Sequence, residues 1–223
     1  MPDHALARYE GGNDMADAHP NTRLEAFCDG VFAIALTLLI IDIKIPSSEV
    51  IGTTREMWLA LRHLTPSILA FVVSFVIILI TWVNHHAAFK LVNKSSASFM
   101  YANGFLLLSV VFLPFPTALV GEYLLTDHAA PAVVIYNSVT AVQAVAWILV
   151  SGTALSNRLT KDEKSAAVMR EYRRNGYLAF VAYSLLALLA FWFPLVIAIV
   201  TTMLWAYWLM SGLRLGARAG AEA

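Results

Sequence analysis

The chain has 223 residues, of which 59% are hydrophobic and 13% are charged, and its mean hydropathy is +0.68. Soluble domains carry about 25% charged residues, so this composition excludes an ordinary soluble domain. The formal net charge is zero, and we expect no nucleic-acid partner. Cys28 is the single cysteine, which excludes a disulfide framework and a cysteine cluster for zinc.

Four long stretches contain no Asp, Glu, Lys or Arg: residues 63–89, 95–121, 128–157 and 175–213. Each is long enough to cross a bilayer as a helix. The pattern predicts an all-α, polytopic membrane protein with one transmembrane domain over residues 23–213. Residues 1–22 are polar and lack the apolar core of a signal peptide, so they are predicted to be a cytoplasmic tail. Residues 214–223 are predicted to form a second cytoplasmic tail.

The first transmembrane helix is predicted over residues 23–45, in "RLEAFCDGVFAIALTLLIIDIKI". Thr22 and Glu25 have the spacing of a capping box at its start, and Pro46 prevents a further turn. At 1.5 Å per residue this helix is about 34 Å long, which is enough to span the hydrocarbon core. Asp29 and Asp42 must then lie toward its ends or face protein.

Five more helices follow in chain order. They are predicted over residues 66–89, 98–120 and 131–154, and as two helices within residues 175–213. As one straight helix the last window would be about 58 Å long, which exceeds a normal span, so we place a turn at Pro194. The sequence therefore predicts six transmembrane helices.

Lys and Arg are distributed unequally between the two predicted sides. If the amino terminus lies on side A, side A holds Arg8, Arg23, Lys90, Lys94, Arg158, Lys161, Lys164, Arg170, Arg173, Arg174, Arg214 and Arg218. Side B holds only Lys44, Arg55 and Arg62. The positive-inside rule makes side A cytoplasmic, so both termini are predicted inside the cell membrane. The basic stretch 157–175 is then a cytoplasmic loop that anchors the topology near anionic lipid.

A helical wheel of the first helix groups several residues on one stripe. With Ile34 at zero and about 100° per residue, that stripe contains Phe27, Gly30, Ile34, Thr37, Leu38 and Ile41. Asp29 falls on the opposite side. Small residues and a threonine are common where membrane helices pack, so ordinary helix packing explains the stripe. A pore wall is the alternative.

The segment "TWVNHH", residues 81–86, lies at the cytoplasmic end of the second helix, at the depth where the first helix begins. Ionisable groups inside a membrane need partners, so we expect a polar belt that joins helices one to three. A metal site is a weaker interpretation, because His85 and His86 are adjacent and point about 100° apart. Catalysis by Cys28 or His85 is also disfavoured, since GxSxG and HExxH patterns are missing. We predict no enzymatic activity, no metal and no cofactor.

The TVGYG filter of ordinary potassium channels is missing, and no ionisable residue falls at the middle of a predicted helix. The second observation disfavours a proton-coupled transporter.

The first helix resembles the signature of the transmembrane protein 175 family, the potassium channels of endolysosomes and bacteria. In this sequence Arg23, Phe27, Asp29, Gly30, Ile34 and Thr37 match that signature, and "WVNHH" at 82–86 resembles the second helix of the family. Cys28 occupies the position of the motif serine, and a thiol is a weaker hydrogen-bonding group.

The resemblance implies a bacterial, single-repeat channel: a homotetramer in which the first helix of each subunit lines a central four-fold pore for K⁺ ions. It implies a hydrophobic gate at Ile34, further apolar rings at Leu38 and Ile41, and a selectivity role for Thr37. It also implies a structural network of Arg23, Asp29, Trp82 and His86. A secondary transporter with a pathway inside each subunit, and a membrane scaffold without transport, are the alternatives.

Overall fold

The computed structural model describes residues 21–49 and 51–221, all in helices, turns or irregular segments apart from one isolated β-bridge. The elements are α1 (Thr22–Leu38), η1 (Leu39–Asp42), α2 (Thr54–His63), α3 (Thr65–Phe89), α4 (Ala97–Phe112), α5 (Pro114–Tyr123), α6 (Ala129–Ser156), α7 (Glu163–Leu189) and α8 (Pro194–Ala221). The predicted all-α fold class is confirmed for this part of the chain. Residues 1–20, which include Arg8, lie outside the described residues.

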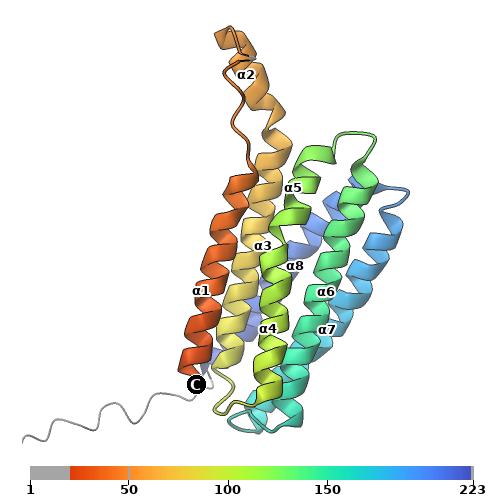
Figure 1. The fold of residues 1–223 in the computed structure, drawn as a ribbon. Coiled ribbons are helices and arrows are strands. Elements are labelled where there is room, and N and C mark those ends of the chain that lie inside the picture. Colours follow the sequence, from red (N-terminus) through yellow and green to blue (C-terminus); the bar gives the residue numbers. More distant parts are fainter. Residues whose placement is uncertain (1–20, 50, 222–223) are drawn as a thin grey trace, which may run out of the picture.

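The long helices form one bundle, and α1 begins at the same end of the bundle at which α8 ends (Figure 1). Within it, α7 packs along α6, α4 packs on α6, and α3 contacts α1, α5 and α8. The short helix α2 stands beyond the opposite end and continues almost directly into α3, because Leu64 caps both helices (Figure 1). Helix α1 therefore lies at the edge of the bundle, with α3 and α4 as its neighbours.

In the part of the chain that the structure describes, five segments are long and apolar enough to cross a membrane: Thr22–Asp42, Thr65–Phe89, Ala97–Tyr123, Ala129–Ser156 and Pro194–Arg214. Helix α7 is also 27 residues long, but its first part carries the charged residues of the predicted basic loop. The prediction of a loop over 157–175 is wrong from Glu163 onward. Asp162 caps the helix there, and its side chain accepts a hydrogen bond of 2.7 Å from the Ser165 backbone. The predicted break at Pro194 is confirmed, since α8 begins at that residue.

The two ends of α1 differ from the prediction. The N-cap is Asn21 instead of Thr22, and the Glu25 carboxylate approaches His86 of α3, so the predicted capping box is wrong. At the other end α1 tightens into the 3₁₀ turn η1, and Ile43 is already extended. The span is therefore Thr22–Asp42, which starts one residue earlier than predicted and ends about one turn earlier. The charges of Asp42 and Lys44 stop the apolar pattern before Pro46 is reached.

The predicted helix over 98–120 is one span but two helices. Pro114 cannot continue the α-helical hydrogen bonding, and α4 ends at Phe112 with Leu113 as the joint. Thr117 of α5 donates a hydrogen bond of 2.7 Å to Ser74 of α3, and Ser74 lies 3.1 Å from the Tyr136 hydroxyl of α6. These contacts join three helices just beyond the break.

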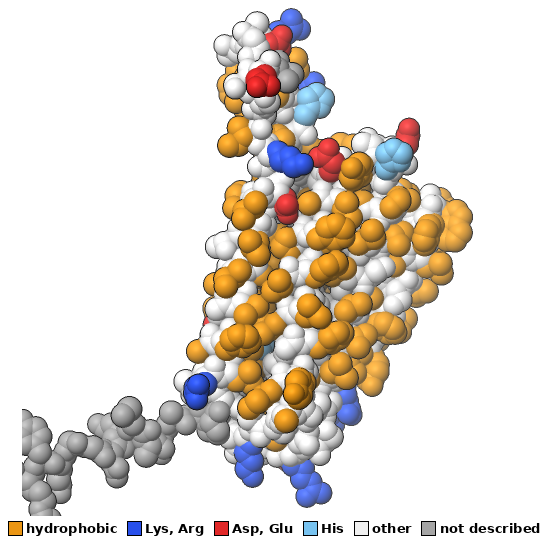
Figure 2. All heavy atoms as spheres, viewed as in Figure 1, with side chains coloured by type: hydrophobic (Ala, Val, Ile, Leu, Met, Phe, Trp, Pro, Cys, Tyr) orange, Lys and Arg blue, Asp and Glu red, His pale blue; other side chains and the backbone are white. Residues whose placement is uncertain are grey.

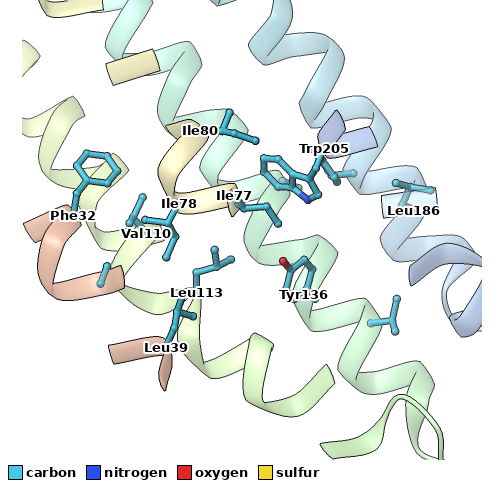
Figure 3. Packing of buried hydrophobic residues seen from close by; sticks show 14 of the residues in the cluster. Phe32, Leu39, Ile77, Ile78, Ile80, Val110, Leu113, Tyr136, Leu186 and Trp205 are labelled. Atoms are coloured by element: carbon cyan, nitrogen blue, oxygen red, sulfur yellow. The ribbon is translucent and has the colours of Figure 1, made fainter. Parts of the chain in front are cut away.

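The buried apolar residues form two clusters along the bundle. One joins α1, α3, α4, α5, α6, α7 and α8, and Figure 3 shows Phe32, Ile77, Val110 and Trp205 among its residues. The other surrounds Phe89 and Phe99 at the end of the bundle where α1 begins. These clusters fix the rotation of α1 about its own axis, which determines the residues that it leaves uncovered.

Two turns lie at the end of the bundle where α1 begins, and they are joined to each other. Val92 and Thr160 form the β-bridge, in which Asn93 donates to the Leu159 carbonyl at 3.1 Å and Lys161 donates to the Leu91 carbonyl at 3.0 Å. Figure 2 shows Lys and Arg side chains at this end and a broad hydrophobic band above it. The band and its basic border are typical of a protein that spans a membrane.

Candidate pore-lining surface and its polar support

Helix α1 has one buried face. Cys28, Phe32, Ala35 and Leu39 recur at helical spacing and are at most 1% exposed. They pack into the larger cluster against α3 and α4. The Cys28 thiol is therefore a buried apolar group in this chain, at the position that the resemblance gives to serine.

The opposite face of α1 is uncovered from end to end. Phe27 is 62% exposed, Ile34 is 57% exposed and Ile41 is 70% exposed. Gly30 lies between them, and a Cβ added there would meet no atom within 4 Å. The described part of the single chain thus places the wheel stripe outside its own bundle, where lipid or another copy of the chain must cover it.

Thr37 lies on this exposed face, and the geometry of its hydroxyl is defined. Its Oγ1 donates a hydrogen bond of 2.8 Å to the carbonyl of Ile34, three residues earlier. Because the hydroxyl proton is used within the helix, the lone pairs of the oxygen remain free to accept or to coordinate. Leu38 is 37% exposed beside it, so the stripe contains one oxygen among apolar side chains.

The polar support of α1 lies toward the other side of the helix. Trp82 of α3 donates its indole N–H to the Asp29 carboxylate at 2.8 Å, and His86 Nδ1 lies 2.8 Å from the Glu25 carboxylate. Trp82 and His86 are four residues apart, and their rings stack with centroids 6.2 Å apart. One face of α3 therefore holds both acidic side chains of α1 near the end at which α1 begins. The sequence analysis proposed Trp82, His86 and Asp29 for this network, whereas it assigned Glu25 to a capping box at the start of the helix.

The role of Arg23 in this network stays a prediction, since within the described residues its exposed side chain forms no hydrogen bond or ion pair. Its place at the end of α1 is taken by Asn21. The Asn21 amide donates to the carbonyls of Val92 and Lys94 at 3.5 and 3.3 Å, which ties α1 to the turn after α3. Asp42 lies at the far end of the span, exposed in the last turn of η1.

His85 lies on a different face of α3 and is completely buried. Its Nε2 is 3.0 Å from the side-chain oxygen of Asn103 on α4, and its ring packs between Phe32 and Phe89. His85 thus joins α1, α3 and α4 from inside the bundle. Within the described residues, no group of three His, Cys, Asp or Glu side chains is placed to hold a metal ion.

Together these features define a class: a multi-pass helical membrane protein whose first helix is joined to its neighbour through two of its own carboxylates. The same helix presents an uncovered apolar stripe. Comparison with known proteins gives the family. The sequence profile of the endosomal/lysosomal potassium channel TMEM175 family matches residues 23–114, which include α1 and α3. Together with the relatives described next, this match shows that the chain belongs to the TMEM175 family.

A potassium channel of Chamaesiphon minutus is 41% identical over 168 residues, which cover 73% of this chain and 82% of the relative. A potassium channel of Streptomyces collinus is 45% identical over 126 residues, 56% of this chain and 60% of the relative. The crystal structure of a potassium-selective TMEM175 homologue from Chamaesiphon minutus superimposes with a TM-score of 0.70. It shares 37% identity and covers 84% of this chain and 96% of that chain.

Proposed function

We propose that this protein is a potassium-selective channel, in which four copies surround a central pore lined by α1. One observation carries the proposal: a chain 41% identical to a named potassium channel turns the Ile34–Thr37 face of α1 away from its own bundle. A single uncovered stripe encloses a path only when copies of the chain surround an axis, so a cyclic oligomer follows from the pore.

Ile34, Leu38 and Ile41 would form successive apolar rings along such a pore. At about 1.5 Å per residue in α1 and about 2 Å in the 3₁₀ turn, Leu38 lies about 6 Å and Ile41 about 12 Å from Ile34 along the axis. A narrow ring of apolar side chains can prevent conduction by excluding water. We assign the gate to these three rings, with Ile34 as the ring nearest the cytoplasmic end.

Thr37 is the residue that we assign to selectivity. Its oxygen is the one side-chain acceptor between the Ile34 and Ile41 rings, and its proton is already donated to the Ile34 carbonyl. Four such oxygens can replace part of the hydration shell of an ion, and they favour the ion that loses its water at the lower cost. This mechanism needs no TVGYG segment.

We also propose six membrane crossings, with both termini cytoplasmic. The common end at which α1 begins and α8 ends supports an even number of crossings (Figure 1). The basic side chains at that end support its cytoplasmic location in the cell membrane (Figure 2). Helix α7 would supply the sixth crossing with the apolar half that follows Arg174.

Recording in planar bilayers tests the proposal. Purified protein under opposed K⁺ and Na⁺ gradients, with no second driving ion, is expected to carry current that reverses near the potassium potential. Current that requires a second ion gradient would favour the alternative, a secondary transporter with its pathway inside each subunit. A folded protein without current in either condition would favour the other alternative, a membrane scaffold without transport. Cross-linking to a tetramer tests the assembly separately.

A further inference from the structure

A second polar feature lies inside each subunit, away from α1. It is a cavity of about 90 Å³ between α3, α6, α7 and α8, lined by Thr81, Asn84, Gln143, Tyr172 and Trp205 among others. A water molecule needs about 10–15 Å³ of such volume, so the cavity has room for several. It takes no part in the polar support of α1.

Residues that line this cavity carry buried polar atoms without a hydrogen-bond partner. Within the described residues these atoms are the Trp205 and Trp208 indole N–H groups, the Tyr172 and Tyr183 hydroxyls and the Asn84 side-chain oxygen. Trp205 is 8% exposed and Tyr172 is 6% exposed, so solvent does not satisfy them. Buried polar groups are normally hydrogen-bonded, and five on the lining of one cavity indicate that something occupies it.

The lining restricts the charge and shape of the occupant. No acidic, basic or histidine side chain of the described chain lines the cavity, so an ion would lose its hydration without compensation. Aromatic rings form much of the wall: Trp147 stacks on Tyr172 with centroids 5.7 Å apart, and Tyr183 lies 5.6 Å from Trp205. The walls suit a flat apolar body.

The unpartnered atoms restrict its polar group. The Trp205 N–H requires an acceptor, the Asn84 oxygen requires a donor, and a hydroxyl supplies both. Asn84 cannot turn away freely, because its amide packs on Gly212 of α8. A Cβ added at Gly212 would overlap the Asn84 side-chain oxygen.

We infer that this cavity is a binding site for a small neutral amphiphile with an alcohol or phenol hydroxyl group. The position of Asn84 gives the site a route to the pore helix. Trp82 and His86, which hold α1, lie on the other side of the same two turns of α3. An occupant that shifts α3 therefore shifts the support of α1, and this consequence alone rests on the proposed channel function.

Binding of 4-bromophenol to the purified full-length protein tests the site without any measurement of current. We expect bromine anomalous density in the cavity in soaked crystals. In detergent we expect saturable quenching of tryptophan fluorescence. Trp205→Phe keeps the ring but removes the donor, and Tyr172→Phe removes only the hydroxyl. Each is expected to weaken binding roughly three- to tenfold, the effect of one hydrogen bond.

Trp192→Phe is the matched control, because Trp192 is 65% exposed and lies outside the cavity lining. It should leave the affinity unchanged. Ordered water alone in the cavity, non-saturable quenching, or equal affinity in all variants that fold would each overturn the inference. Should Trp205→Phe fail to fold, Tyr172→Phe decides by the same criteria. Because the experiment measures binding and not current, its failure would contradict the proposed binding site without contradicting the proposed channel function.

Discussion

The indole of Trp82 reaches across from α3 and donates a 2.8 Å hydrogen bond to the carboxylate of Asp29 on α1. This bond points away from the stripe that contains Ile34 and Thr37. The rotation of α1 is thus set by a polar contact on one side and by the buried residues Phe32 and Leu39 beside it. Any effect of this contact on ion flow must act through the position of the helix.

Asp29→Ala is expected to destabilise the fold. It leaves the Trp82 N–H without its acceptor in a partly buried place, at a cost of about 1–3 kcal/mol. Asp29→Asn keeps an oxygen at the same position and should lose less. Thermal unfolding of the purified assembly, monitored together with size-exclusion chromatography, measures both variants. An Asp29→Ala protein with the parent's size and melting temperature would show that the contact is dispensable.

Ile34→Ala is expected to raise conductance. The change widens the first apolar ring and lowers the barrier that excludes water from it. Discrimination between K⁺ and Na⁺ should relax if that ring is the narrowest point. Ile199→Ala is the control, since Ile199 on α8 is 58% exposed, close to the 57% of Ile34, but lies outside α1. Equal single-channel conductance in the two variants and the parent would remove Ile34 from the gate.

The start of α2 is expected to depend on pH. Glu56 accepts hydrogen bonds from the backbone N–H groups of Gly52 and Thr53 at 2.8 and 2.9 Å, and these bonds hold its pKa below the usual value. Its folded pKa is therefore lower than its unfolded pKa. The contribution to α2 is complete above the unfolded pKa and is lost as the pH falls through the folded one.

Hydrogen exchange of residues 54–63 measures this effect, with faster exchange expected in acid. Glu56→Gln retains an acceptor but not the charge, so the pH dependence should disappear while much of the protection remains. Glu56→Ala should exchange fast at every pH. A parent protein whose α2 exchanges with the same protection on both sides of the titration would contradict the assignment.

Arg158 offers a stabilising substitution. It has φ of 52°, a left-handed conformation that favours glycine, at the end of α6. Leu159 donates to the Ala154 carbonyl and Arg158 donates to the Leu155 carbonyl, which is the Schellman pattern. Arg158→Gly should stabilise the protein by up to about 1 kcal/mol. Arg158→Ala loses the same charge but keeps the Cβ, so it should bring no gain in a denaturation experiment.

Much of the fold could be predicted from charge-free windows, because apolar length and prolines determine where helices cross and break. The break between the last two helices at Pro194 was predicted correctly for this reason. Helix α2 was not predicted, since its 10 residues are short and polar, although Thr53 and Glu56 carry the capping-box signal. The same signal at Thr22 and Glu25 was misleading, because a tertiary partner, His86, takes the carboxylate.

The rotation of α1 was predictable from the wheel, since burial alternates with the helical period. The partners of its polar residues were harder to predict. Trp82 and His86 lie one turn apart and so share a face of α3, which a sequence can show. Which of them contacts Asp29 and which contacts Glu25 depends on the positions of α1 and α3 relative to each other along their axes. The contacts of Arg23 could not be predicted, because a sequence pattern does not determine the direction of a long, exposed side chain.

Thr37 gives the sharpest test of the proposed selectivity. Its hydroxyl donates to the Ile34 carbonyl, three residues earlier, and not to the Ala33 carbonyl, four residues earlier. The bond uses the proton and leaves the oxygen lone pairs on the exposed stripe. Thr37→Val keeps the branched shape and removes the oxygen, whereas Thr37→Ser keeps the oxygen and removes a methyl group.

If four Thr37 oxygens replace part of the hydration shell of K⁺, Thr37→Val should lower the permeability ratio of K⁺ to Na⁺ while conductance still depends on Ile34. Thr37→Ser should stay close to the parent, because its hydroxyl can make the same bond. Reversal potentials under matched gradients measure both. If the valine variant retained the parent ratio, the hydroxyl would serve only the helix backbone, and discrimination would have to come from the width of the Ile34 ring.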